Sequence, residues 1–215
     1  MPELEELLEL SKSIATQAGQ SLLSGLNQNH KNYFHSVDYP KEIKALADTV
    51  LEKEILKVLG LKGLPILSEE SGYIPGQQDS KYWFIVDPLD GTREFIHRRG
   101  DFTVNIAYIE HGVPTRGIVY APAKGRLFYT LANGQSVEEI GEFDKNQAAP
   151  PQPIRVNQAD NTALMVVASK SHRDRQTDAY IEKYAVKDMK SAGSSLKFCL
   201  IATGEADLYP RLGRT

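Results

Sequence analysis

Two aspartates follow directly on a short apolar segment near the middle of the chain. Asp87 and Asp90 lie in the string D-P-L-D-G-T, after the nearly continuous apolar run of residues 82–86. Such a run is typical of a strand that is buried on both faces. Two carboxylates at the end of a buried strand are costly unless a positive charge lies between them. The spacing therefore indicates a cation site, and Mg²⁺ prefers oxygen ligands of this kind.

The residues around the two aspartates favour the same chemistry. Pro88 fixes its own φ and holds Asp87 extended, so both carboxylates and the Leu89 carbonyl could converge on one point. Gly91 and Thr92 open a helical segment, and free backbone N–H groups at a helix start can hold a phosphate. The alternative is structural: one aspartate ends the strand and the other caps the helix.

The composition of the 215 residues is ordinary for a globular protein. A formal net charge of −3 gives no support for binding a nucleic-acid polymer. The single cysteine, Cys199, cannot form an internal disulfide, which favours a reducing compartment. No apolar run has transmembrane length, and the acidic N-terminus lacks the pattern of a secretory signal. We therefore expect a cytoplasmic protein without a transmembrane segment, and its oligomeric state stays open.

Periodicity predicts an α+β pattern in the first half of the chain. Helical spacing of apolar residues predicts helices over 2–26 and 40–59. A short strand is expected at 64–67, and a flexible loop over 72–80. Asn133-Gly134 indicates a hairpin turn in which both residues have positive φ. Four further segments indicate an antiparallel meander, over 102–110, 115–120, 127–131 and 135–140.

The pattern changes after residues 141–153, a polar segment with three prolines that we interpret as a linker. Strands then alternate with helices, which indicates an α/β domain. The expected elements are a strand at 164–168, a helix at 174–184, a strand at 187–191, a helix at 193–206 and a strand at 207–210. We expect an N-terminal α+β domain with the antiparallel sheet and the metal site over 1–150, and a C-terminal α/β substrate-binding domain over 151–215.

The string D-P-L-D-G-T after W-F-I-V resembles the metal-binding signature of the inositol monophosphatase superfamily, a group of Mg²⁺-dependent phosphomonoesterases. Its continuation, R-E-F-I-H-R-R-G-D-F-T-V-N-I-A-Y-I, is similar to the 3'(2'),5'-bisphosphate nucleotidase branch. The resemblance implies a layered α-β-α-β sandwich and two or three Mg²⁺ ions. It also implies a small nucleotide bisphosphate substrate, 3'-phosphoadenosine 5'-phosphate, which is hydrolysed to AMP and phosphate as in sulfur assimilation.

The resemblance assigns catalytic and metal-binding roles to single residues. Glu69, in L-S-E-E, would bind metal and contact the attacking water, with Glu70 in support. Thr92 would also orient the water, together with Asp48 in A-L-A-D. The family's usual threonine shortly before that aspartate is absent, and a surface Asp48 paired with Lys44 is the alternative. The implied metal ligands are Glu69, Asp87, Asp90 and the Leu89 carbonyl.

Three strings in the second half match the nucleotidase substrate site: S-K-S-H, A-G-S-S-L-K and Y-P-R. Each is weak alone, since a Gly-Ser-Ser helix start is more often only a cap. Cys199, in K-F-C, would be a core residue. The resemblance assigns substrate binding to His172, Ser194, Lys197 and Arg211, and the phosphate to the N–H groups of Gly91 and Thr92.

The family continues past R-L-G with a tryptophan–aspartate pair that carries a further metal ligand, whereas this sequence stops at Thr215. We therefore expect an incomplete second domain and low activity from these 215 residues. Two alternative functions stay open. An inositol or sugar phosphatase of the same fold is disfavoured by S-S-x-K-F-C with Y-P-R. A non-catalytic nucleotide- or metal-binding regulator is disfavoured by the intact acidic residues but favoured by the early end.

Overall fold

The computed structural model describes residues 4–28, 39–77, 81–143, 147–158, 160–169 and 173–213. Side chains are described in these ranges except at 25–28, 39–48 and 147. The chain divides into two compact units, residues 1–152 and 153–215. Each unit has hydrophobic clusters of its own.

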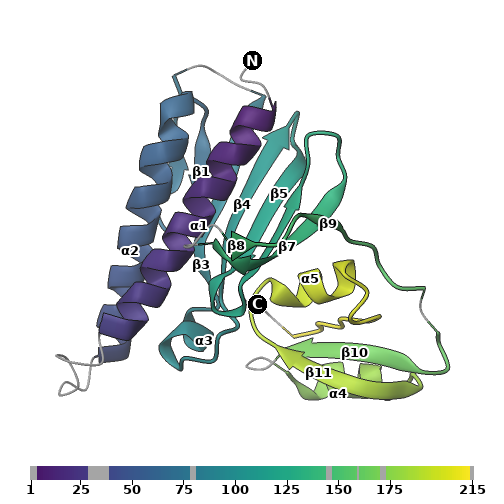
Figure 1. Cartoon of the computed structure of the whole chain (residues 1–215). Helices are drawn as coiled ribbons and strands as arrows, with labels where there is room; N and C mark the ends of the chain where they lie inside the picture. The colour runs from purple at the N-terminus through teal and green to yellow at the C-terminus, as the bar shows by residue number, and fades with distance from the viewer. Residues whose placement is uncertain are drawn as a thin grey trace. The chain divides into compact units, whose positions relative to one another are not determined.

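A nine-stranded sheet forms the frame of the first unit (Figure 1). Its strands are β1 Ile66–Ser68, β2 Gly72–Ile74, β3 Tyr82–Asp90, β4 Thr103–Glu110, β5 Val113–Ala121, β6 Arg126–Thr130, β7 Ser136–Glu142, β8 Gln147–Ala148 and β9 Gln152–Pro153. They lie in the order β2-β1-β3-β4-β5-β6-β7-β8, and β9 pairs with β7. The pairs from β3 to β8 are antiparallel, whereas β1 runs parallel to β3. The predicted antiparallel meander is therefore confirmed.

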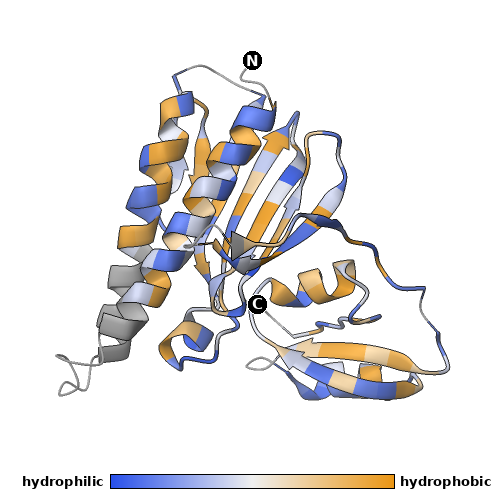
Figure 2. Ribbon diagram, viewed as in Figure 1, coloured by the Kyte–Doolittle hydropathy of each residue, from blue (hydrophilic) through white to orange (hydrophobic). Residues whose placement is uncertain are grey.

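Two long helices pack on this sheet, α1 Leu4–Gln28 and α2 Tyr39–Leu59. α1 contacts β4 and β5, while α2 contacts β3 and α1 (Figure 1). Hydrophobic and hydrophilic residues alternate along the coloured parts of both helices, as expected when one face is buried (Figure 2). The buried face joins the sheet in one core that includes Leu7, Ile14, Ala18, Ile55, Phe84 and Val104. None of the described helices is long and apolar enough to cross a membrane.

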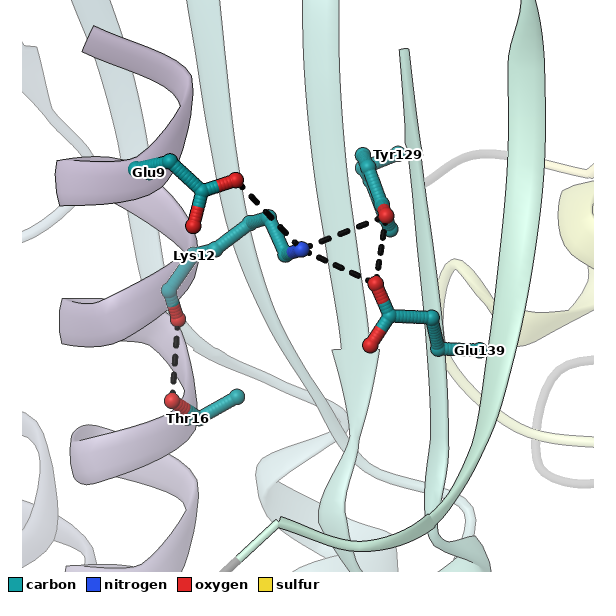
Figure 3. Close-up of polar contacts among 5 residues, drawn as sticks. All are labelled: Glu9, Lys12, Thr16, Tyr129 and Glu139. Atoms are coloured by element: carbon teal, nitrogen blue, oxygen red, sulfur yellow. Dashed lines mark hydrogen bonds and ion pairs between the residues drawn. The ribbon is translucent and has the colours of Figure 1, made fainter. Parts of the chain in front are cut away.

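A polar network fastens α1 to the sheet. Lys12 Nζ lies 2.9 Å from Glu139 Oε1 on β7 and 3.2 Å from the Tyr129 hydroxyl on β6 (Figure 3). The Tyr129 hydroxyl donates to the same carboxylate oxygen of Glu139. Glu9, one turn before Lys12, lies 3.6 Å from the ammonium group. The part-buried ammonium group of Lys12 is therefore paired, and an unpaired charge at such a place would be costly.

The second unit is built on two parallel strands, β10 Leu164–Ser169 and β11 Val186–Ala192. Helix α4, Arg175–Ile181, connects them, and helix α5, Leu196–Ala202, follows β11. The Asp174 side chain accepts a hydrogen bond from Thr177 N at 2.8 Å and so caps α4. The alternation of strands and helices expected for this half is present.

The hairpin turn at Asn133 and Gly134 differs from the expectation. The β6–β7 loop has three residues, 132–134, closed by Leu131 N donating to Gln135 O at 2.8 Å. Within it only Gly134 has positive φ, 87°. A three-residue loop needs one left-handed residue, whereas a two-residue turn needs two. The two-residue case occurs at His111 and Gly112, with φ of 52° and 80°.

Three other segments also differ. Residues 72–74, expected in a flexible loop, form β2 because they pair with β1 in an antiparallel register. Helix α5 is seven residues long instead of spanning 193–206. Ser194 before it has φ of 50°, a left-handed conformation that cannot continue a right-handed helix. The strand expected at 207–210 is a single bridge between Val166 and Leu208.

Candidate active site

The two aspartates of the central string lie at the end of β3, where the strand bulges. Asp87 pairs with Asn105 of β4, and Asp90 pairs with Thr103. Two residues of β3 thus oppose one residue of β4, Val104, which defines a β-bulge. Asn105 and Thr103 are two positions apart and share a face, so their partners share one as well. The bulge therefore brings both aspartates to one face, although residues three apart in a regular strand point to opposite faces.

Glu69 reaches the same place from the neighbouring strand. It follows β1 directly, and its backbone N–H donates to Val86 O at 3.0 Å. Its side chain is hydrogen-bonded to that of Asp87. Burial, this bond and the charge of Asp90 together raise the pKa of Asp87 to about 8. Asn105 opposes the rise weakly, because its Nδ2 lies 3.4 Å from the carboxylate. A carboxyl group with so high a pKa marks a place where negative charge is crowded.

The donors at this place suit a hard cation. Glu69, Asp87 and Asp90 supply carboxylate oxygens, and the Leu89 carbonyl supplies another oxygen, the ligand type that Mg²⁺ prefers. Positive charge would relieve the crowding that raises the pKa of Asp87. In the described ranges, however, no three His, Cys, Asp or Glu side chains form a ready metal cage. The fit to a cation therefore rests on the chemistry of the donors and on the raised pKa.

The turn after Asp90 begins a short helix, α3, Thr92–Ile96. Gly91 occupies the N-cap position with φ of 88°, a left-handed conformation that favours glycine. The residue at the N-cap is thus Gly91, and the interpretation of Asp90 as the helix cap is wrong. Thr92 Oγ1 lies 3.4 Å from the Leu89 carbonyl oxygen. The Thr92 hydroxyl therefore lies beside one of the candidate metal ligands.

Asp48 lies on α2, but its side chain is outside the described part of the structure. His172 is also outside the described residues. The roles predicted for these two residues stay predictions.

In the second unit, Ser194 and Lys197 lie together at the start of α5. Lys197 Nζ donates to the Ser194 carbonyl at 2.5 Å and lies 5.5 Å from the centre of the Tyr209 ring. The lysine is only 6% exposed. Arg211 acts on another residue: the pKa of Asp174 is lowered first by Thr177 and further by the charge of Arg211. The structure thus joins Ser194 to Lys197 and places Arg211 near the cap of α4.

Two side chains next to the candidate metal ligands were not predicted from the sequence. Asn105 contacts Asp87, and Glu52 on α2 is bonded to both sides of the turn that carries Glu69. A signal existed for each of them. Asn105 is an amide in an apolar strand, and Glu52 falls on the buried stripe of α2, three residues before Ile55.

The sequence and the fold match a known family. The model of the inositol monophosphatase family matches residues 3–215, and the chain belongs to this family. The 3'(2'),5'-bisphosphate nucleotidase CysQ of Escherichia coli K12 is 44% identical over 158 residues, which cover 71% of this chain and 58% of that protein. The CysQ of Buchnera aphidicola is 37% identical over 218 residues, 98% of this chain and 77% of that protein.

A solved structure agrees with both sequence relatives. The crystal structure of CysQ from Bacteroides thetaiotaomicron, described as a bacterial member of the inositol monophosphatase family, has a TM-score of 0.78 and 31% identity. The similarity covers 98% of this chain and 81% of that one. The expected fold, a sandwich of helices and a mostly antiparallel sheet, is therefore confirmed. The chain spans 58% of the length of its E. coli relative.

Proposed function

We propose that the chain is a Mg²⁺-dependent phosphomonoesterase that hydrolyses 3'-phosphoadenosine 5'-phosphate to AMP and phosphate. The observation that carries the proposal is the cluster of Glu69, Asp87 and Asp90, in which burial first, then the hydrogen bond to Glu69 and the charge of Asp90, raise the pKa of Asp87 to about 8. Such a carboxylate cluster destabilises the folded chain unless a cation binds to it. The name of the CysQ relatives, 3'(2'),5'-bisphosphate nucleotidase, supports the choice of substrate.

Two or three Mg²⁺ ions would be held by Glu69, Asp87, Asp90 and the Leu89 carbonyl. When bound, they would supply the positive charge that favours deprotonation of the attacking water and offsets charge on the leaving oxygen. The protein's own part is to orient that water, through Glu69 and the Thr92 hydroxyl. Asp48 is proposed to help from α2.

Each unit has residues that are proposed to bind phosphate groups of the substrate. Backbone N–H groups of Gly91 and Thr92 would bind oxygens of the phosphate that is removed. The left-handed conformation of Gly91 supports this, since it turns the chain sharply before α3. In the second unit, the buried Lys197 beside Ser194 provides a positive charge for a second phosphate. Arg211 and His172 are proposed to bind substrate as well.

We also infer a cytoplasmic protein with a small-molecule substrate and no nucleic-acid polymer as partner. Cys199 is buried and is the single cysteine of the sequence, which supports a reducing compartment. This thiol lies on α5, where it packs as a core residue and has no proposed part in catalysis.

Release of phosphate tests the proposal. The 215-residue chain would be assayed with Mg²⁺ on 3'-phosphoadenosine 5'-phosphate and on inositol 1-phosphate, beside E. coli CysQ as a control for the assay. We expect release from the nucleotide that is lost in Asp90→Asn. Release from inositol 1-phosphate alone would overturn the choice of substrate. Tight nucleotide binding without any release would overturn the catalytic proposal and favour a regulator.

A further inference from the structure

Glu52 is a buried carboxylate that the proposed function does not use. It lies on α2 and is only 8% exposed. Its Oε1 accepts hydrogen bonds from the Ser68 hydroxyl and from Ser71 N at 3.0 Å. Its Oε2 accepts a hydrogen bond from the Ser71 hydroxyl at 2.7 Å. Both oxygens of one buried carboxylate thus serve a single turn of the chain.

That turn carries the candidate metal ligand from β1. Ser68 is the last residue of β1, and Ser71 comes directly before β2. The residues between them are Glu69 and Glu70, so the three hydrogen bonds to Glu52 bracket this acidic pair. Glu69 N is tied separately to the Val86 carbonyl of β3. The turn is therefore fixed to α2 on one side and to the strand of Asp87 on the other.

An ionised carboxylate suits this position better than the side chains of similar size. Both of its oxygens only accept hydrogen bonds, and the negative charge strengthens each of these bonds. A glutamine keeps only one acceptor oxygen, and because its NH₂ group can only donate, a serine hydroxyl would have to turn and accept instead. An apolar side chain would leave the Ser68 and Ser71 donors without their acceptor, which is costly in a buried site.

We propose that Glu52 is a positioning residue that holds the turn 68–71 so that Glu69 faces Asp87. It does so from the helix that also carries Asp48, one turn earlier. Three of the elements proposed to shape the metal site are thereby linked: α2, the β1–β2 turn and the end of β3. The inference rests on the proposed function, since it gives Glu69 and Asp87 their role as metal ligands.

The test compares two glutamates of α2 that bind different parts of the unit. Glu54, two positions after Glu52, accepts a hydrogen bond from Ser21 Oγ of α1 at 3.1 Å. Glu52→Gln and Glu54→Gln remove the same charge from the same helix, but only the first affects the turn 68–71. The readout is Mg²⁺ affinity by titration calorimetry, with Tm measured in chelator as the index of folding.

We expect Glu52→Gln to weaken Mg²⁺ binding by about 10–100-fold, as is typical when a residue that orients a metal ligand is lost. Glu54→Gln should leave the affinity within about two-fold of the unsubstituted chain, on the expectation that distant sites act independently. If Glu52→Gln lowers Tm but leaves Mg²⁺ affinity unchanged, Glu52 only joins α2 to the sheet and the inference is overturned.

Ser71→Ala separates position from charge and covers the case in which Glu52→Gln does not fold. It removes one hydrogen bond to Glu52 and keeps the carboxylate. Weaker Mg²⁺ binding in Ser71→Ala supports positioning, whereas unchanged binding contradicts it. The result is independent of turnover: if the unsubstituted chain binds Mg²⁺ without releasing phosphate, the proposed function fails while the role of Glu52 is still decided. If it binds no Mg²⁺, the inference fails as well.

Discussion

Lys12 and Glu139 are separated by 127 positions in the sequence, and their charged groups lie 2.9 Å apart in the folded chain. Burial lowers the pKa of Lys12, but the hydrogen bonds to Glu139 and Tyr129 outweigh it, and the net pKa is raised. The pKa of Tyr129 is raised as well, first by burial and then by its bond to Glu139. Both groups therefore keep their protons more firmly in the folded chain than in the unfolded one.

This network predicts a loss of stability at alkaline pH. A group whose pKa is raised by folding stabilises the protein below its unfolded pKa, and this contribution is lost as pH rises through the folded value. Here the loss should begin above about pH 10, near the ordinary pKa of tyrosine and lysine. Lys12→Met should lower the free energy of unfolding at neutral pH by about 1–3 kcal/mol, because the Glu139 carboxylate loses its positively charged partner. Urea denaturation from pH 7 to 11 measures both effects, and a parent chain whose stability does not fall over the alkaline part of this range would contradict the assignment.

Gly19 of α1 predicts a reversal of the usual effect of alanine in a helix. Alanine in place of glycine ordinarily stabilises a helix by up to about 1 kcal/mol. A Cβ at Gly19, however, would lie 2.3 Å from Tyr120 Cε1 and 3.0 Å from Pro122 Cβ. We therefore expect Gly19→Ala to destabilise the chain by about 1–3 kcal/mol, as overpacked cores do. Gly60→Ala is the control, since nothing lies within 4 Å of its Cβ, and it should be neutral or slightly stabilising. A stabilised Gly19→Ala would show that the helix shifts freely away from β5.

The helices and the meander could be predicted from the sequence because their signals are local. The helix expected over 2–26 is observed at Leu4–Gln28, and that over 40–59 at Tyr39–Leu59. In both, the apolar spacing reports which face will be buried, whatever it packs against. The strands of the meander follow for the same reason, from alternation bounded by turn residues.

The site could be predicted only in part, because its geometry depends on pairs that are distant in the sequence. Asp87 and Asp90 share a face only because β3 bulges against Thr103 and Asn105, and this register cannot be read from D-P-L-D-G-T. Glu52 accepts a hydrogen bond from Ser68, which lies 16 residues later in the sequence. A single glutamate on a helix carries no sign of which turn it will meet.

Substitution of Lys197 is expected to weaken nucleotide binding by more than an effect on folding alone would. Its ammonium is buried beside Ser194 and over the Tyr209 ring. Loss of a charged hydrogen-bonding group typically costs about 1.5–3 kcal/mol. We therefore expect Lys197→Met to weaken binding of 3'-phosphoadenosine 5'-phosphate by about 10–100-fold, with a smaller effect on AMP, which lacks the second phosphate. The measurement is titration calorimetry.

The matched control for this substitution is Lys183→Met. Lys183 is exposed in the same unit and also lies over an aromatic ring, that of Tyr180, at 5.6 Å. Its loss should leave nucleotide affinity unchanged. An affinity of Lys197→Met equal to that of the unsubstituted chain would remove Lys197 from the proposed site. An equal loss of affinity in both variants would show that the effect comes from net charge.

Asp87 predicts a conflict between stability and metal binding. Its pKa is raised to about 8 by burial, by Glu69 and by Asp90, so the ionised form is disfavoured in the folded chain without metal. A raised pKa means that stability is lost as pH rises towards 8. Asp87→Asn removes this charge and should raise Tm in chelator at pH 8 or above, by about 2–4 °C for each kcal/mol of repulsion relieved. The same substitution should abolish the rise of Tm with Mg²⁺, which at 100 times the dissociation constant is worth about 2.7 kcal/mol. Asp188→Asn, at an exposed position of β11, is the control and should change neither quantity. A lower Tm of Asp87→Asn in chelator would mean that Asp87 stabilises the fold, and a retained rise of Tm with Mg²⁺ would place the cation elsewhere. Asp87 is identified as a metal ligand only if the substitution raises Tm in chelator and also abolishes the rise of Tm with Mg²⁺.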